Sequence, residues 1–157
     1  DAQGRVIVDT VRATDFQLGA GSADSTTPVW ETTDYERDVP KSTLCRYTLN
    51  PVDRTSSRTE LCPRYVDFPT INRRVSGRPY RYAYCSTGAS AESASPFQGV
   101  IKVDVEQGAH DVWLAPPEMC VGEFVFTPRE GAAADAAEDD GYLITLAHDA
   151  ARGKASA

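Results

Sequence analysis

Alternation of apolar and polar positions is the main pattern of this chain, and it predicts a series of short β-strands. Residues 44–49 alternate and are rich in β-branched and aromatic side chains, as a strand with one packed face requires. Residues 99–105 repeat this pattern before the turn residue Gly108. Further strands are predicted at 57–61, 64–68, 80–85, 111–114, 124–127 and 142–148, with a shorter β-prone run around Ile7, Val8 and Val11.

Residues 80–85 place three tyrosines on one face of the predicted strand and Arg81, Ala83 and Cys85 on the other, and one face is expected to be packed and one wet. Pro69 is expected to stop the strand before it, because proline cannot donate to a ladder.

No segment has sustained helical periodicity with capping residues, so the chain is expected to be all-β. The small, polar run 19–27 and the acidic run 132–140 predict loops, and Gly141 is expected to supply a positive φ in a tight turn. Short strands separated by turns are typical of a sandwich, barrel or propeller, and no crisp internal repeat decides between them. No linker divides residues 1–157, so they are predicted to belong to one domain.

Composition narrows the function classes. The 157 residues are 41% hydrophobic and 25% charged, which is ordinary for a globular domain with a core. A net charge of −7 argues against binding to nucleic acid or to an anionic membrane surface. No apolar run reaches the length of a membrane span. The chain begins at Asp1 without a leader pattern, so it is expected to be a piece of a longer protein.

The four cysteines are scattered without a Cys-x-x-Cys pair, which does not suit a zinc site. They are expected to be reduced, partly buried thiols. Compartment is left open, with an intracellular location (cytoplasm or plastid) favoured over secretion.

Six short motifs between residues 44 and 149 resemble, in order, those of the carotenoid cleavage oxygenase family, which includes carotenoid and lignostilbene dioxygenases and a retinoid isomerase. The motifs are Leu44-Cys-Arg-Tyr-Thr-Leu-Asn50, Asp67-Phe-Pro-Thr-Ile-Asn72, Gly77-Arg-Pro-Tyr-Arg-Tyr-Ala-Tyr84, Val100-Ile-Lys-Val-Asp104, Gly122-Glu-Phe-Val-Phe-Thr-Pro-Arg129 and Glu138-Asp-Asp-Gly-Tyr-Leu143.

The resemblance implies a seven-bladed β-propeller, of which this chain would supply several late, unclosed blades. It implies Fe(2+) held by four histidines, O2-dependent cleavage of a conjugated double bond to two carbonyl products, and a carotenoid, apocarotenoid or related polyene or stilbene as substrate. It is also compatible with peripheral membrane contact of the full-length protein. Substrate, cleavage position and a dioxygenase or isomerase outcome stay open, and the chain alone is expected to be inactive.

The two histidines, His110 and His148, match no ligand position of the family, so no residue of this chain is assigned as a catalytic group or metal ligand. Two carboxylates do match positions that accept the second N–H of an iron-bound imidazole. They are Glu123, which is identical to the family residue, and Asp67, which replaces a glutamate and is one methylene shorter.

Two other interpretations are kept. In the first, the full protein is a propeller that has lost catalysis and serves as a binding or scaffold module, and Asp67 is its only support. In the second, the chain is an unrelated all-β binding domain that is complete at 157 residues.

Overall fold

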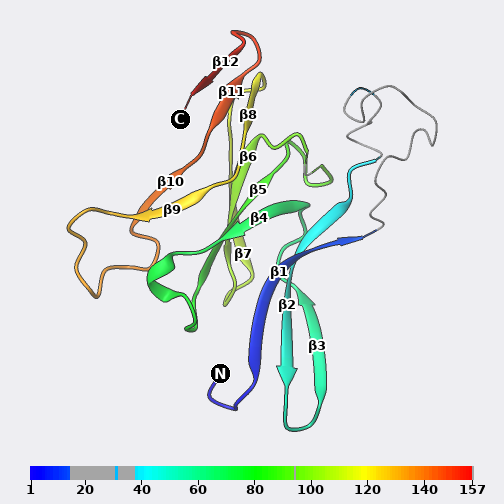
Figure 1. Cartoon of the computed structure of the whole chain (residues 1–157), viewed down its shortest axis with the longest axis vertical. Coiled ribbons are helices and arrows are strands. Elements are labelled where there is room, and N and C mark those ends of the chain that lie inside the picture. The colour runs from blue at the N-terminus through cyan, green and yellow to red at the C-terminus, as the bar shows by residue number, and fades with distance from the viewer. Residues whose placement is uncertain (15–30, 32–37, 94, 157) are drawn as a thin grey trace.

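The computed structural model describes residues 1–14, 31, 38–93 and 95–156, and side chains up to residue 153. Within this part the chain forms antiparallel sheets joined by short connections, and the N- and C-terminal ends lie far apart (Figure 1). The first sheet, in the order β1-β2-β3, comprises β1 (Val6–Thr14), β2 (Lys41–Asn50) and β3 (Thr55–Glu60). The second, in the order β4-β5-β6-β7, comprises β4 (Val66–Thr70), β5 (Tyr82–Thr87), β6 (Gly99–Asp104) and β7 (Ala109–Leu114).

The C-terminal third forms one interrupted hairpin with an added strand. Its strands are β8 (Met119–Val121), β9 (Val125–Pro128), β10 (Gly141–Ile144), β11 (Ala147–Asp149) and β12 (Lys154–Ser156). β9 pairs with β10, and β8 pairs with β11, which also pairs with β12. A single 3-10 turn, η1 (Arg73–Val75), lies between β4 and β5.

The predicted strands are found close to their expected places, with instructive differences. β4 continues through Pro69 to Thr70, so the predicted stop is wrong. The strand tolerates proline because β4 is at the edge of its sheet and its ladder is already irregular there. The predicted strand 142–148 is two strands, β10 and β11, while β8 and β12 were not predicted. The 132–140 loop is observed, and the 19–27 loop lies outside the described residues.

The expectation of one packed and one wet face for residues 80–85 is wrong, because both faces of β5 are buried. Ala83 and Cys85 point into one apolar cluster, and Tyr80 packs against that same cluster. Tyr84 belongs to a second cluster on the opposite face, against which Tyr82 packs. Tyr80 precedes the strand, so the alternation that relates the other two tyrosines does not extend to it.

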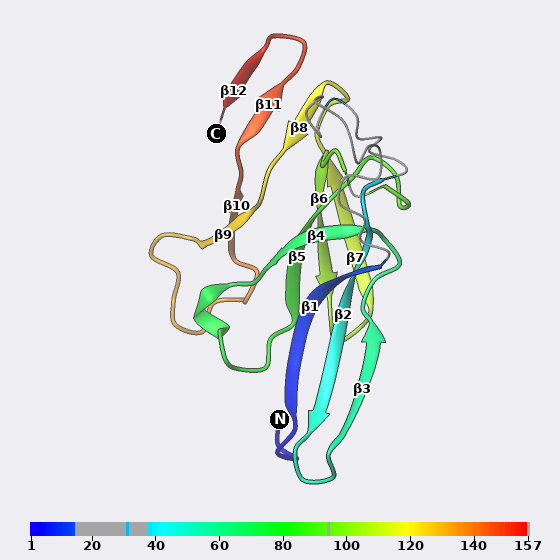
Figure 2. The ribbon, with the colours of Figure 1, turned by 45° about the vertical axis from the view of Figure 1, so that its right-hand side comes forward.

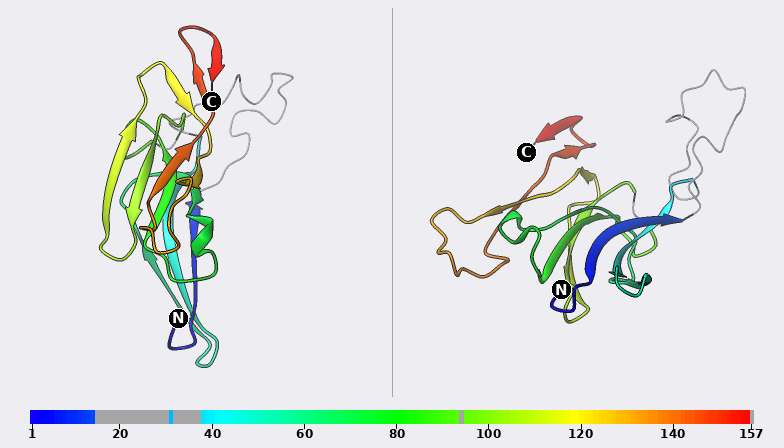
Figure 3. Two further views of the ribbon diagram at one scale, coloured as in Figure 1. Left: turned by 90° about the vertical axis from the view of Figure 1, so that its left-hand side faces the viewer. Right: turned by 60° about the horizontal axis from the view of Figure 1, so that its bottom comes forward.

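The sheet β4–β7 therefore lies between two cores. The first core fills the space towards the β1–β3 sheet, with Leu44 of β2 packed beside Val66, Ile101 and Val103. β4 lies against β1 and β2 (Figure 2), and side views show the two sheets as neighbouring layers (Figure 3). Each of these aliphatic side chains, fully withdrawn from water, contributes roughly 1.5–3 kcal/mol.

The second core joins the β4–β7 sheet to the C-terminal strands. Tyr84 stacks on Phe126 with ring centroids 5.4 Å apart and an interplanar angle of 20°. Val100, Val121 and Phe124 complete its centre. In β6, Val100 faces this core while Ile101 faces the first one, so consecutive residues serve different layers. In the described part of the chain, no helix is long and apolar enough to cross a membrane.

The three carboxylates of the acidic turn before β10 make structural contacts. The carboxylate of Glu138 accepts hydrogen bonds from the backbone N–H groups of Arg81 and Tyr82 at 2.7–3.0 Å. Asp139 pairs with Lys102 at 2.5 Å and Asp140 pairs with Arg129 at 2.7 Å. These contacts fasten the 129–141 loop to the β4–β7 sheet and to β9.

Gly141 does not have the positive φ that its turn position suggested. Glycine is needed there because β10 approaches β9 closely: a Cβ atom would lie 2.4 Å from the Thr127 carbonyl oxygen and 2.6 Å from the Phe126 ring.

We predict that Gly141→Ala destabilises the intact protein by about 1–3 kcal/mol, because the backbone carbonyl of Thr127 cannot move aside without breaking the ladder. The matched control is Gly122→Ala, whose added carbon would meet its nearest neighbour at an ordinary 3.6 Å. Urea unfolding of both variants checks this, and equal midpoints would contradict it.

We predict a pH-dependent contribution from Asp139. The hydrogen bond from Lys102 lowers the pKa of Asp139 below its ordinary value of 3.8. The ion pair therefore contributes fully above pH 3.8, and its contribution is lost as pH falls through the lowered value. Because both side chains are about a third exposed, Asp139→Asn should cost only about 0.2–1 kcal/mol at pH 7. Unfolding free energies measured down to pH 3 should converge for wild type and variant, whereas the exposed control Asp135→Asn should show no such trend.

Candidate functional site

Asp67 lies at a β-bulge in β4. It stands directly opposite Ser86 of β5, but the next pair is Thr70 with Tyr84, so Phe68 and Pro69 together oppose one residue. Phe68 has a φ of +50°, a conformation that costs a bulky side chain of order 1–3 kcal/mol. The Asp67 Oδ1 atom accepts the Phe68 backbone N–H at 2.8 Å, which holds this bend. Bulges of this kind re-aim side chains and are frequent beside active sites.

Glu123 lies at a second irregularity of the same type. Between the β8–β11 and β9–β10 ladders, the segment 122–124 stands opposite only Thr145 and Leu146, so one residue is extra. The Gly122 backbone N–H donates to the Leu146 carbonyl at 2.9 Å inside this interruption. Phe124 is 5% exposed and anchors the segment in the second core, whereas Glu123 is exposed on the other side.

One buried side chain connects the two carboxylate positions. Ser86 is the cross-strand neighbour of Asp67, and its hydroxyl donates to the carbonyl of Gly122 at 3.0 Å. Because Gly122 directly precedes Glu123, the two sequence-predicted residues come from different sheets to one region of the fold. Asp67 is half-buried there and Glu123 is exposed, so both can accept hydrogen bonds from a neighbouring group.

Neither histidine lies on the segments that carry Asp67 and Glu123. His110 is exposed on β7, at the far edge of the second sheet, and His148 is exposed on β11 opposite Cys120. In the ranges that the structure describes, no three histidine, cysteine, aspartate or glutamate side chains are grouped to hold a metal ion. In this part of the chain the residues do not form a ligand set, and the two carboxylates offer oxygen acceptors.

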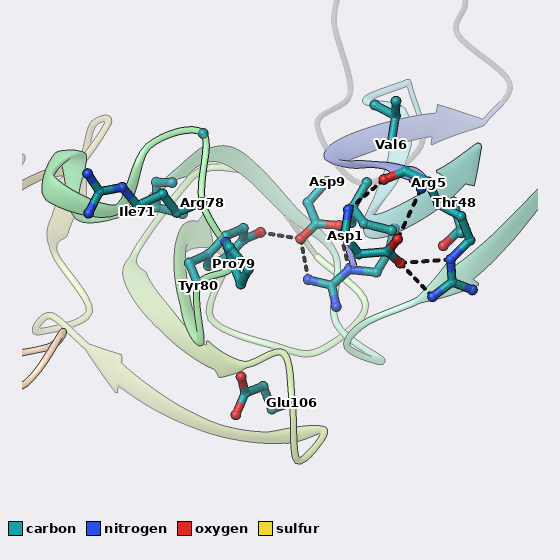
Figure 4. A pocket seen from close by; sticks show the side chains of 13 residues that line it. Asp1, Arg5, Val6, Asp9, Thr48, Ile71, Arg78, Pro79, Tyr80 and Glu106 are labelled. Carbon is teal, nitrogen blue, oxygen red and sulfur yellow. Dashed lines mark hydrogen bonds and ion pairs between the residues drawn. The ribbon is translucent and has the colours of Figure 1, made fainter. Parts of the chain in front are cut away.

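A groove of about 650 Å³ lies between β1–β2 and the 71–80 segment (Figure 4). Its centre is an ion pair in which the Arg46 guanidinium donates to both oxygens of Asp9, at 2.8 and 2.7 Å. The Tyr80 hydroxyl also donates to Asp9. Burial and the Asp9 charge raise the pKa of Tyr80, so it stays a protonated donor. These three side chains satisfy one another and fasten the first sheet to the second.

The cysteines are free thiols, and three of them, Cys45, Cys62 and Cys85, are buried. Burial raises the pKa of Cys62 and Cys85, which keeps both as unreactive thiols in the first core. They carry no site.

Sequence reasoning missed Ser86 and a second buried serine, Ser42 of β2, whose hydroxyl donates to the Val66 carbonyl at 2.7 Å. The local sequence carried no clear signal, because Ser42 stands between Lys41 and Thr43 and Ser86 between Cys85 and Thr87. A hydroxyl that is buried needs a partner, but burial itself was not readable at these positions. The partner itself could not be read, because it belongs to another sheet.

Comparison with known proteins gives consistent results. The family described as Retinal pigment epithelial membrane protein matches residues 1–157. The apocarotenoid-15,15'-oxygenase of Synechocystis is 35% identical over 107 residues, covering 68% of this chain and 21% of that relative. Torulene dioxygenase of Fusarium fujikuroi is 28% identical over 158 residues, covering 94% of this chain and 26% of the relative.

Among solved structures, a variant of the Synechocystis apocarotenoid oxygenase superposes with a TM-score of 0.84 at 28% identity, over 97% of this chain and 30% of that one. The chain thus spans between a fifth and a third of the length of these relatives. The family match also includes the first 43 residues, which the sequence motifs left out. With its unclosed antiparallel sheets as blades of the family's β-propeller, this chain belongs to the carotenoid cleavage oxygenases.

Proposed function

We propose that the protein containing this chain is an oxygenase that uses O2 to cleave a conjugated double bond of a carotenoid or apocarotenoid, giving two carbonyl products. Family membership supports the reaction class, since the matched relatives are carotenoid and apocarotenoid oxygenases. The observation that carries the proposal is the placement of Asp67 and Glu123 at two adjoining bulges, joined through Ser86.

In this proposal the two carboxylates support a metal centre completed by other parts of the protein. Fe(2+), when bound by imidazoles, would supply the site at which O2 is activated beside the polyene. Glu123 and Asp67 would each accept the second N–H of a ligand imidazole, which fixes the tautomer and the ring orientation. An exposed carboxylate on an otherwise apolar segment suits this role, because it reaches a partner outside the chain described here.

Asp67 has a shorter reach than the glutamate it replaces. The bulge offers a compensation, because an extra residue moves the backbone and re-aims the side chain. Its Oδ1 atom is engaged by the Phe68 N–H, so the second oxygen, Oδ2, would meet the imidazole.

We predict that Glu123→Gln in the full-length protein lowers iron affinity and kcat by roughly 10–100-fold, since a neutral amide orients an imidazolium-like donor poorly. Asp67→Asn should act in the same direction, and Asp67→Glu should preserve or improve affinity. Iron binding is measured by competition with a chelator, and turnover by O2 uptake and chromatography of the carbonyl products.

The control for these variants is Glu130→Gln, which removes the same charge from an exposed position on the following turn. An unchanged iron affinity in both Glu123→Gln and Asp67→Asn would refute the support role. Absence of iron binding and turnover in the wild-type protein would favour a propeller that serves as a binding or scaffold module.

We further predict that the 157-residue chain expressed alone neither binds iron tightly nor cleaves an apocarotenoid. It contains two histidines, both exposed, and among the described residues neither is grouped with carboxylates or cysteines to hold a metal ion. Equilibrium dialysis and product analysis check this, and turnover by the chain alone would overturn the assignment of the ligands to other parts of the protein.

A further inference from the structure

Two buried serines make equivalent contacts between consecutive sheets. Ser42 lies in β2, the second strand of the first sheet, and donates to the Val66 carbonyl in β4, the first strand of the next sheet. Ser86 lies in β5, the second strand of that sheet, and donates to the Gly122 carbonyl, which opens the break in the first strand of the C-terminal hairpin. The bonds measure 2.7 and 3.0 Å, and the serines are 5% and 0% exposed.

The acceptor carbonyls hold equivalent positions. Val66 directly precedes Asp67, and Gly122 directly precedes Glu123. Each of these carboxylates in turn begins or lies within an interruption where one strand has an extra residue. The same contact therefore occurs twice, one sheet apart, at the two places where a functional carboxylate leaves the ladder.

A hydrogen bond to this carbonyl constrains the carboxylate that follows. The carbonyl oxygen and the next residue's nitrogen belong to one rigid peptide plane, so fixing the oxygen fixes the direction in which the next residue starts. The ladder constrains this direction only in part, because the register is lost directly after Asp67 and Glu123 lies inside an interruption. A donor from a neighbouring, well-packed strand replaces the missing constraint, and its burial protects the bond from water.

Ser86 shows how firmly the donor itself is held. It stands between Cys85 and Thr87, both 0% exposed, in a strand paired on both sides, with β4 and with β6. Ser86 also pairs directly with Asp67, so one residue is linked to both bulges.

We propose that Ser42 and Ser86 are positioning residues, whose hydroxyls orient Asp67 and Glu123, respectively, towards the groups that these carboxylates support. This inference rests on the proposed function of the two carboxylates. Neither serine touches substrate or metal, and each acts through the peptide plane that precedes its carboxylate.

The test is a pair of double-mutant cycles in the full-length protein. Ser86→Ala is combined with Glu123→Gln, and Ser42→Ala with Asp67→Asn. For every variant, iron affinity is measured by chelator competition, kcat and KM with an apocarotenoid, and the melting temperature of the metal-free protein. The control is Thr87→Val, because Thr87 is equally buried in β5 and its hydroxyl donates to a carbonyl, that of Tyr65, which does not adjoin either carboxylate.

Each single serine variant is expected to weaken iron binding roughly tenfold, at the low end of the range for groups that orient metal ligands. kcat should fall while KM stays unchanged, because binding of the polyene is not affected. The loss should disappear when the matching carboxylate is already replaced, since the serine then has nothing to orient. Thr87→Val should lower the melting temperature by a similar amount without changing iron affinity.

The inference is overturned if the serine variants lose only melting temperature, or if their effect on affinity adds in full to that of the carboxylate variants. In both cases the carboxylate variants alone would still lose affinity, and the proposed function would stand. If Glu123→Gln and Asp67→Asn leave iron affinity unchanged, the support role of the carboxylates fails and the positioning role fails with it.

Discussion

Burial of the central strands β5 and β6 on both faces is the constraint on which the other features of this chain depend. Consecutive residues of β5 and β6 point into different cores, so a polar side chain in these strands is shielded from water on either face. Three buried polar side chains of these strands are paired with groups outside their own strand: Ser86 with Gly122, Thr87 with Tyr65, and Asp104 with Arg81. In the described residues no buried side-chain polar atom lacks a partner. Because the partners belong to other segments, the need to satisfy these groups also fixes how neighbouring sheets meet.

The chain divides its carboxylates into two sets. Asp9, Glu138 and Asp139 are engaged by guanidinium, backbone N–H or ammonium groups and serve to join segments. Asp67 and Glu123 carry no ion pair among the described residues, and both lie where a ladder is interrupted. An acidic cluster such as 138–140 is conspicuous in the sequence, yet its geometry is structural. The two isolated carboxylates are the ones left available for the proposed role.

Alternation and β-prone composition predicted most strands and their order, including β3 and β7, in which every residue is exposed. The motif resemblance selected Asp67 and Glu123 as candidate site residues. It also implied the propeller, which alternation alone could not distinguish from a sandwich or barrel. The irregularities were not predictable: Val121 and Phe124 are both buried although an odd number of positions separates them. Only the partner strand reveals that a residue is extra. The hydrogen bonds of Ser42 and Ser86 were not predictable for the same reason, since an acceptor in another sheet leaves no signal in the local sequence.

The bulge at Phe68 and Pro69 has a consequence for how this protein can change over time. An extra residue in one strand reverses which positions face inwards, so the segments before and after it are in opposite phase. Deleting one residue there would restore a regular ladder in which Asp67 still faces Ser86 and Thr70 still faces Tyr84, but the bend beside Asp67 would be lost. Point substitutions can tune the reach of Asp67, as the loss of one methylene relative to glutamate illustrates, whereas loss of the extra residue would change the direction of the carboxylate while β4 stays paired with β5. The irregularity is therefore the place in β4 where a one-residue change in chain length would alter the carboxylate and not the pairing of the strand.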